Sequence, residues 1–117
     1  MASLLSSLFG NHSDINNLDY DSFEKMLNED KNSVLIDVRT FGENKSLRIP
    51  NTILIDIHKP NFLDQIEKLD RSKSYFVYCR SGGRSHSAYK QMKSMGFEKV
   101  YNLKGGIINW HGKTEQG

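Results

Sequence analysis

The sequence predicts an α/β protein in which helices cover both faces of a parallel β-sheet. Short, nearly continuous runs of β-branched and aromatic residues, such as Val34–Val38 and Ser74–Tyr78, alternate with segments of helical periodicity. Apolar runs of this kind are typical of strands that are buried on both faces, as in parallel sheets. The 117 residues contain no internal repeat and no convincing linker, so we expect a single domain.

The first half of the chain begins with residues 1–14, which we expect to be a loosely held leader. Asp19 is a favourable N-cap residue for a helix that ends near Asp30. The apolar face of this helix is formed by Phe23, Met26 and Leu27. The other elements expected here are an edge strand at Ile15–Leu18, a strand at Val34–Val38, a short helix or turn at Thr40–Ser46, a break at Ile49–Asn51 and a strand at Thr52–Ile57.

The second half is predicted to contain two helices and two strands, followed by a short final helix. Pro60 suits the start of the first helix. Its expected apolar face consists of Phe62, Leu63, Ile66 and Leu69. The second helix is indicated by the stripe Ala88, Tyr89, Met92 and Met95, and Gly96 suits its end. The remaining elements are strands at Ser74–Tyr78 and Lys99–Leu103 and a last helix that Gly105 and Gly106 open.

The only cysteine, Cys79, ends the second of these apolar runs and precedes a loop with two glycines and two arginines. The thiol is therefore expected at the carboxyl end of a strand, where open α/β sheets bind ligands. Backbone N–H groups of the loop and the positive end of the following helix dipole favour an anion. The same field, with Arg80 and Arg84, is expected to lower the pKa of Cys79. A lone cysteine is more often a small buried hydrophobic residue, and the glycine–arginine loop is what favours a functional role.

The composition gives no reason to expect a nucleic-acid or membrane partner. The net charge is +2, and Lys and Arg are spread along the chain without a long basic run. No segment approaches the ~20 apolar residues of a membrane-spanning helix, and the N-terminus lacks the features of a signal peptide. One cysteine cannot form an intramolecular disulfide, and a thiolate site needs reducing conditions, so we expect a cytoplasmic protein.

Three separated motifs together resemble the rhodanese-like sulfurtransferases in their single-domain form. The segment Asp37-Val-Arg39, followed by Leu47–Thr52, resembles a D-V-R and G-H-I-P-G-A signature. Cys79–Ser85 resembles the active-site loop, and Leu103–Trp110 resembles the closing L-x-G-G-x-x-x-W motif. The resemblance covers residues 15–112, which leaves 1–14 as the leader and 113–117 as a tail. It implies a central five-stranded parallel sheet flanked by helices.

The first motif departs from the family pattern. Leu47 and Arg48 stand where glycine and histidine are usual, and Asn51 and Thr52 replace glycine and alanine. We interpret this segment as structural, a turn into the second strand of the motif, so the departures concern the local backbone shape and not the chemistry.

The resemblance implies a sulfurtransferase that carries a sulfane sulfur on Cys79. The thiolate would attack the outer sulfur of a small anionic donor such as thiosulfate, and sulfite would leave a persulfide behind. A thiol, cyanide or a protein acceptor would then take the terminal sulfur. No cofactor and no metal are implied.

The loop residues are expected to bind the substrate and the persulfide. Backbone N–H groups from Arg80 to Ser85 would stabilise the negative charge, and Gly82 and Gly83 permit the tight backbone that this requires. Arg84 is a better candidate than Arg80 for holding the oxygen atoms of the donor. The other members of the expected site are Ser81, a candidate hydrogen-bond donor; Ser85, for which we favour helix capping; and Asp37 with Arg39, for which we favour a buried supporting pair over substrate contact.

Two alternatives stand beside the sulfurtransferase. A cysteine phosphatase of the same fold needs Cys-x5-Arg, whereas Arg84 follows Cys79 after four residues and Ser85 occupies the position of the phosphatase arginine. A persulfide carrier without independent turnover is left open by the sequence. The four histidines have no spacing that would join Cys79 in a zinc site, and we interpret His86 as a helix-surface residue and not a general base.

Overall fold

The computed structural model describes residues 16–117, so the expected leader and Ile15 lie outside the described residues. Within this range five strands form one sheet in the order β1-β5-β4-β2-β3, and every neighbouring pair is parallel. The strands are β1 (Asn17–Leu18), β2 (Ser33–Asp37), β3 (Thr52–Leu54), β4 (Ser74–Tyr78) and β5 (Val100–Leu103). The helices are α2 (Tyr20–Glu29), α3 (Phe41–Ser46), α4 (Phe62–Glu67), α5 (Gly83–Ser94) and the 3₁₀ turn η2 (Ile107–Asn109). The predicted α/β fold with a five-stranded parallel sheet is confirmed.

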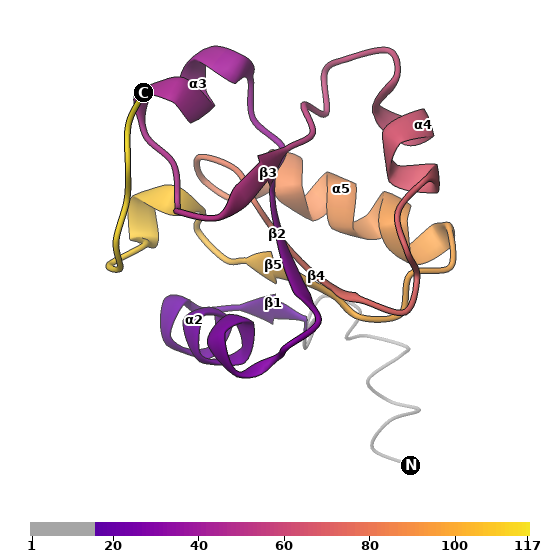
Figure 1. Ribbon diagram of the computed structural model, residues 1–117, viewed down its shortest axis with the longest axis horizontal. Coiled ribbons are helices and arrows are strands. Elements are labelled where there is room, and N and C mark those ends of the chain that lie inside the picture. Colours follow the sequence, from indigo (N-terminus) through magenta and orange to yellow (C-terminus); the bar gives the residue numbers. More distant parts are fainter. Residues whose placement is uncertain (1–15) are drawn as a thin grey trace.

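The helices cover the two faces of the sheet, with α4 and α5 on one face and α2 on the other (Figure 1). Successive residues of a strand point to opposite faces. On β4, Tyr75 and Val77 therefore pack with α4 and α5, whereas Phe76 and Tyr78 pack with Phe23 of α2. All five residues of β4 are buried, which explains the continuous apolar run in the sequence.

The strand order places a topological switch point between β2 and β4. The chain leaves β2 through α3 to reach β3 on one side, and it leaves β4 through α5 to reach β5 on the other. Open α/β sheets bind ligands in the crevice beyond the carboxyl ends of the two strands at such a point. Asp37 ends β2 and Cys79 follows β4, so the fold brings two of the sequence motifs to this crevice.

Two details differ from the sequence predictions. Strand β3 ends at Leu54 and not at Ile57, although the Ile55 and Ile57 N–H groups still donate to the carbonyls of Asp37 and Val38. Leu63 was expected on the apolar face of α4 but is 49% exposed, so that expectation is wrong. The helix begins only at Phe62 and buries Phe62 and Ile66, which are four residues apart and share one face.

The departures in the first motif preserve a turn. Asn51 has φ +65°, the left-handed conformation that glycine adopts most readily and that asparagine tolerates better than most residues. The tail is also tied to this region, because Arg48 and Glu115 exchange two backbone hydrogen bonds of 2.9 Å. No described helix has the length and apolar character needed to cross a membrane.

Candidate active site

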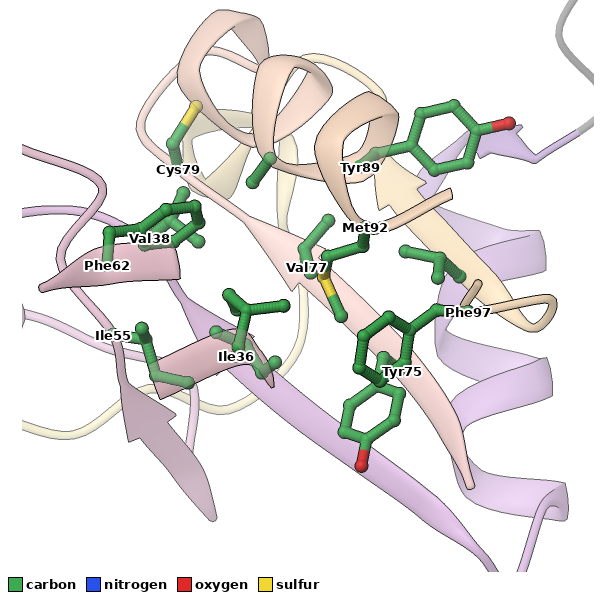
Figure 2. Close-up of a cluster of buried hydrophobic side chains, with 13 residues drawn as sticks. Ile36, Val38, Ile55, Phe62, Tyr75, Val77, Cys79, Tyr89, Met92 and Phe97 are labelled. Carbon is green, nitrogen blue, oxygen red and sulfur yellow. The ribbon is translucent and has the colours of Figure 1, made fainter. Parts of the chain in front are cut away.

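Cys79 lies immediately beyond β4, beside the N-terminus of α5. Its side chain belongs to the hydrophobic cluster between the sheet and helices α4 and α5, and Figure 2 shows it at the edge of that cluster. The residue is only 1% exposed. Cys79 is therefore in contact with apolar side chains, as a small buried hydrophobic residue would be, and its sulfur also faces the polar groups of the loop that follows.

The loop directs three hydrogen-bond donors at the sulfur. The Gly82 N–H donates to Sγ over 3.1 Å, and Ser85 donates through its N–H over 3.4 Å and through its hydroxyl over 3.3 Å. Gly82 adopts φ +105°, which a side chain would make costly, and this conformation turns its N–H inward. Gly82 is also the N-cap residue of α5, so the capping role that we favoured for Ser85 is wrong. Ser85 stands one turn into the helix, and its hydroxyl lies 3.3 Å from the sulfur and 3.3 Å from the Gly82 carbonyl oxygen.

These donors set the ionisation of the thiol. Burial alone would raise the pKa of Cys79, but the Ser85 hydroxyl and the N–H groups of Ser85, Gly82 and Ser81 outweigh it and lower the pKa. The predicted direction is therefore confirmed. The leading causes are hydrogen bonds to the sulfur, and not the two arginines to which the sequence analysis also attributed the effect.

The closing motif, Leu103–Trp110, is hydrogen-bonded to the cysteine loop, a role that was not predicted from the sequence. The N–H groups of Ile107 and Ile108 donate to the carbonyls of Cys79 and Arg80 over 2.9 and 3.2 Å. Gly106 also lies against the Arg80 carbonyl, since a Cβ atom added to Gly106 would overlap the Arg80 oxygen. The Arg80 carbonyl is thus held by the Ile108 N–H, and a glycine at position 106 permits the close approach of the two segments.

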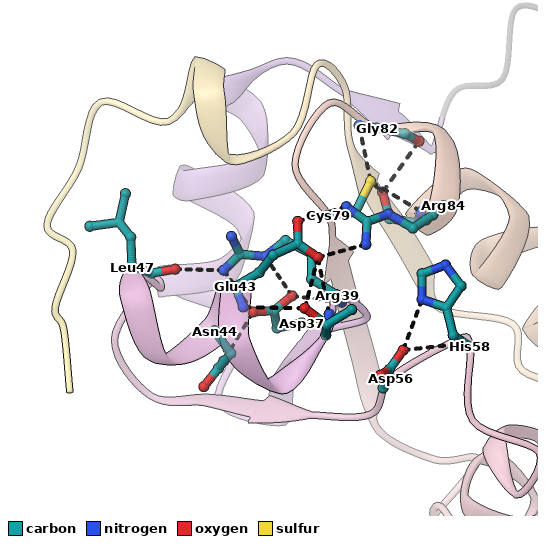
Figure 3. A network of polar contacts seen from close by, with 12 residues as sticks. Asp37, Arg39, Glu43, Asn44, Leu47, Asp56, His58, Cys79, Gly82 and Arg84 are labelled. Carbon is teal, nitrogen blue, oxygen red and sulfur yellow. Dashed lines mark hydrogen bonds and ion pairs between the residues drawn. The ribbon is translucent and has the colours of Figure 1, made fainter.

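Arg84 forms a two-pronged ion pair with Glu43 of α3. Nη1 and Nη2 donate to the two carboxylate oxygens over 2.8 and 2.9 Å (Figure 3). The Thr40 N–H and hydroxyl also donate to Glu43, over 3.2 and 3.1 Å, in the capping box that begins α3. The Arg84 guanidinium, helped by Thr40, holds the pKa of Glu43 at about 2, so this carboxylate is charged at neutral pH.

Glu43 is the residue at the site that sequence reasoning missed. The spacing of Thr40 and Glu43 fits a capping box and could have indicated where α3 begins. It could not have indicated the pairing with Arg84, which lies 41 residues along the chain and meets Glu43 only across the switch point.

Asp37 and Arg39 form the buried pair that the sequence analysis favoured. Arg39 Nε and Nη2 donate to the Asp37 carboxylate over 2.9 and 2.8 Å, and both side chains are almost fully buried. Arg39 also donates to the Leu47 carbonyl, and Asn44 donates to Asp37 (Figure 3). The pair therefore ties the end of β2 to the C-terminal half of α3, the helix that carries Glu43.

The remaining expected residues lie around the rim. Arg80 and Ser81 are exposed, and Arg80 is in no ion pair with residues 16–117. Gly83 is the first residue of α5, and its N–H is not among the groups bonded to the sulfur. His86 is half-buried with its ring 5.7 Å from that of Tyr89. In the described part of the chain, no three His, Cys, Asp or Glu side chains are grouped to hold a metal ion.

Comparison with known proteins agrees with this geometry. The family model of the rhodanese-like domain matches residues 19–113. A sulfurtransferase from Allochromatium vinosum is 31% identical over 96 residues, which cover 82% of this chain and 88% of that protein. A putative sulfur carrier protein from Bacillus subtilis, YrkF, is 33% identical over 109 residues, covering 90% of this chain and 56% of the carrier.

A solved structure supports the same assignment. The crystal structure of a rhodanese-like domain protein from Staphylococcus aureus superposes with a TM-score of 0.75 at 25% identity, covering 88% of this chain and 99% of that one. The motifs, the sheet order, the cysteine loop and the relatives agree, and the chain belongs to the rhodanese-like domain family of sulfurtransferases and sulfur carriers.

Proposed function

We propose that the protein transfers sulfane sulfur through a persulfide on Cys79. The observation that carries this proposal is the set of three donors from Gly82 and Ser85 directed at one buried sulfur atom. Such preorganised donors stabilise a thiolate before the reaction and the charge of a persulfide after loading. The proposal includes no separate general base, because these donors lower the pKa of Cys79 and so favour its thiolate form.

The proposed reaction has two displacement steps. The Cys79 thiolate attacks the outer sulfur of a donor such as thiosulfate, an S–S bond forms, and the S–S bond of the donor breaks as sulfite leaves with its electron pair. A thiolate or cyanide then attacks the terminal sulfur of the persulfide and regenerates the Cys79 thiolate. Transfer in two steps through a covalent intermediate predicts ping-pong kinetics.

The roles of the other site residues follow from their positions. We propose that Gly82, Gly83 and Ser85 shape the pocket for the terminal sulfur, with Ser81 at its rim. Arg84 and the exposed Arg80 are proposed to hold the donor's oxygen atoms, and Asp37 and Arg39 to support the loop without touching substrate. The acceptor in the cell would be a small thiol or a protein, and the compartment a reducing one such as the cytoplasm, where a persulfide cysteine survives.

The test is to supply thiosulfate and cyanide and to measure thiocyanate. We expect turnover by the wild-type protein and a loss to background in Cys79→Ser. Intact-mass measurement after thiosulfate alone should show one added sulfur atom, located on Cys79 by peptide mapping. Thiocyanate formation that persists in Cys79→Ser, or a sulfur located elsewhere, would contradict the proposal.

A persulfide carrier is a second candidate, because one relative is named a putative sulfur carrier protein. Carrier and enzyme share the loaded state and differ in the second step. If Cys79 loads with sulfur but small thiols and cyanide do not discharge it catalytically, the carrier function is favoured over independent turnover.

The phosphatase alternative is disfavoured by the loop. Ser85 stands where that chemistry needs an arginine, and its hydroxyl is directed at Cys79. A rate of aryl phosphate hydrolysis above the rate of sulfur transfer would favour the phosphatase over the sulfurtransferase.

A further inference from the structure

The charge of the candidate active site is unusual for a site that would take a dianion. Arg84 is the residue expected to hold the oxygens of thiosulfate, yet its end-on edge is already occupied by Glu43 through bonds of 2.8 and 2.9 Å. A carboxylate in this position makes the same paired contact that a sulfonate-like group would make. An anionic donor must therefore share Arg84 with Glu43 or displace it.

Glu43 is held firmly in that position. Thr40 fixes the Glu43 carboxylate through the capping box, and α3 itself is tied to β2 by the buried Asp37–Arg39 pair. The low pKa of Glu43 means that protonation does not release Arg84 at neutral pH. Displacement of Glu43 would leave a charged, half-buried group without its partner, which costs free energy.

The surrounding charges do not offset this competition. Arg39 is neutralised by Asp37, as Arg84 is by Glu43. Among the described residues of the loop, Arg80 is then the remaining cation, and its side chain is exposed. Figure 3 shows the Arg84 guanidinium between the Glu43 carboxylate and Cys79, and Arg84 interacts electrostatically with both. A dianion approaching the sulfur thus meets the negative charges of Glu43 and of the thiolate. Besides Arg84, the described cations near the loop are Arg80 and Lys104, and Lys104 lines the same surface depression as Ser81 and Gly82.

We propose that Glu43 determines donor specificity by competing for Arg84, so that the site disfavours thiosulfate and prefers persulfide donors of low net charge. This inference rests on the proposed function, because it concerns the loading of the same Cys79. The preferred step is attack of the Cys79 thiolate on the terminal sulfur of the donor R–S–S⁻. The S–S bond of the donor breaks, R–S⁻ leaves with the electron pair, and Cys79 carries the persulfide.

The experiment compares two donors of different charge. Thiosulfate is a dianion, whereas the persulfide of cysteamine carries an ammonium group and has no net charge when the persulfide is ionised. The rate of sulfur loading onto Cys79 is measured for each donor by quenched intact-mass analysis. In Glu43→Gln we expect loading by thiosulfate to rise about tenfold, equivalent to roughly 1.4 kcal/mol, and loading by cysteamine persulfide to change less than about twofold.

Two control variants isolate the effect. Glu67, the last residue of α4, forms a different ion pair, with Arg71. Glu67→Gln should change the loading rate with neither donor. In the double variant Glu43→Gln with Arg84→Ala, the gain with thiosulfate should disappear, because the gain requires the released guanidinium. The second variant separates competition for Arg84 from a general change in structure.

The outcomes distinguish this inference from the function on which it rests. If wild-type Cys79 loads but Glu43→Gln leaves the thiosulfate rate unchanged, or raises both rates equally, the specificity role of Glu43 is overturned while sulfur transfer stands. If neither donor loads wild-type Cys79, the proposed function itself fails.

Discussion

Ser85 contributes two of the three hydrogen bonds to the Cys79 sulfur, and its hydroxyl is the strongest single influence that lowers the pKa of the thiol. The hydroxyl is completely buried with the sulfur, so no water replaces it there. Hydrogen bonds from Ser85 and the loop N–H groups are therefore the main causes that lower the pKa of Cys79, and Arg84 interacts with it electrostatically.

Replacing Ser85 by Ala should raise the pKa of Cys79, because the thiolate loses a donor while its burial remains. Alkylation by iodoacetamide at neutral pH should slow about two- to tenfold, which corresponds to a net contribution of roughly 0.5–1.4 kcal/mol from one hydrogen bond. The pH dependence of the alkylation rate measures the shift directly. Ser87→Ala, at an exposed serine on the same helix, is the control. An unchanged pH profile in Ser85→Ala would assign the activation to the backbone N–H groups alone.

The sequence was informative at the residue scale where the physics is local. Cys79, the two loop glycines and the start of α5 are neighbours in the chain, so their grouping could be predicted. Whether Ser85 caps the helix or faces the sulfur depends on which residue the helix starts from, and periodicity does not fix a boundary that closely. Glu43 lay beyond reach because its role depends entirely on a contact between distant segments.

At the scale of elements, the turn between β5 and η2 acts as a brace for the cysteine loop. Gly106 combines φ +71° with ψ −167°, a region that is essentially restricted to glycine, and it lies against the Arg80 carbonyl. The sequence analysis expected Gly105 and Gly106 only to open the last helix, which they do. The brace could not be predicted, because it needs β4 and β5 to be adjacent in the sheet.

Gly106→Ala should destabilise the protein by about 2 kcal/mol or more, from the strained backbone together with the clash. Urea unfolding followed by fluorescence measures the difference. Gly42→Ala is the matched control, because a Cβ atom there meets nothing within 4 Å and alanine favours the helix by roughly 0.5–1 kcal/mol. A Gly106→Ala protein as stable as the wild type would show that the turn between β5 and η2 accommodates a side chain with little loss in the free energy of unfolding.

The partial failures at β3 and α4 have a common physical reason. Apolar residues in Thr52–Ile57 continue past the last ladder position, because Ile55 is buried against α4 outside the regular sheet. Leu63 is exposed although Phe62, beside it in the chain, is buried. A hydrophobic pattern identifies a strand or one face of a helix only when the element is long enough for its residue periodicity to be recognised.

For the whole molecule, the pair of Glu43 and Arg84 joins the two halves of the sheet across the switch point. Helix α3 belongs to the connection between β2 and β3, and α5 to the connection between β4 and β5. The strand order was not predicted, but the α/β class and the parallel sheet of this architecture follow from the alternation of strands and helices and were predictable. The electrostatic tie between its halves was not.

The stability that this pair contributes should depend on pH. The pKa of Glu43 is lowered in the folded state from 4.5 to about 2, so its contribution is fully present above about pH 4.5 and is lost as the pH falls towards 2. Glu43→Gln should therefore lower the free energy of unfolding by about 1 kcal/mol at pH 7, a value discounted for partial exposure, with the difference shrinking below pH 4. Urea unfolding of both proteins between pH 7 and pH 3 tests this. A difference that stays constant with pH would mean that the pair adds no ionic stabilisation.

The hydrogen bond from the Gly82 N–H to the sulfur makes this backbone amide a spectroscopic probe of the chemical state of Cys79. The Gly82 nitrogen is 3.1 Å from the Cys79 sulfur, and its N–H donates to this atom, whose charge changes between thiol, thiolate and persulfide. Its resonance in a nitrogen–proton correlation spectrum should move with each of these states. An isotope-labelled sample would thus report the redox and loading state of Cys79 without any probe attached to the sulfur.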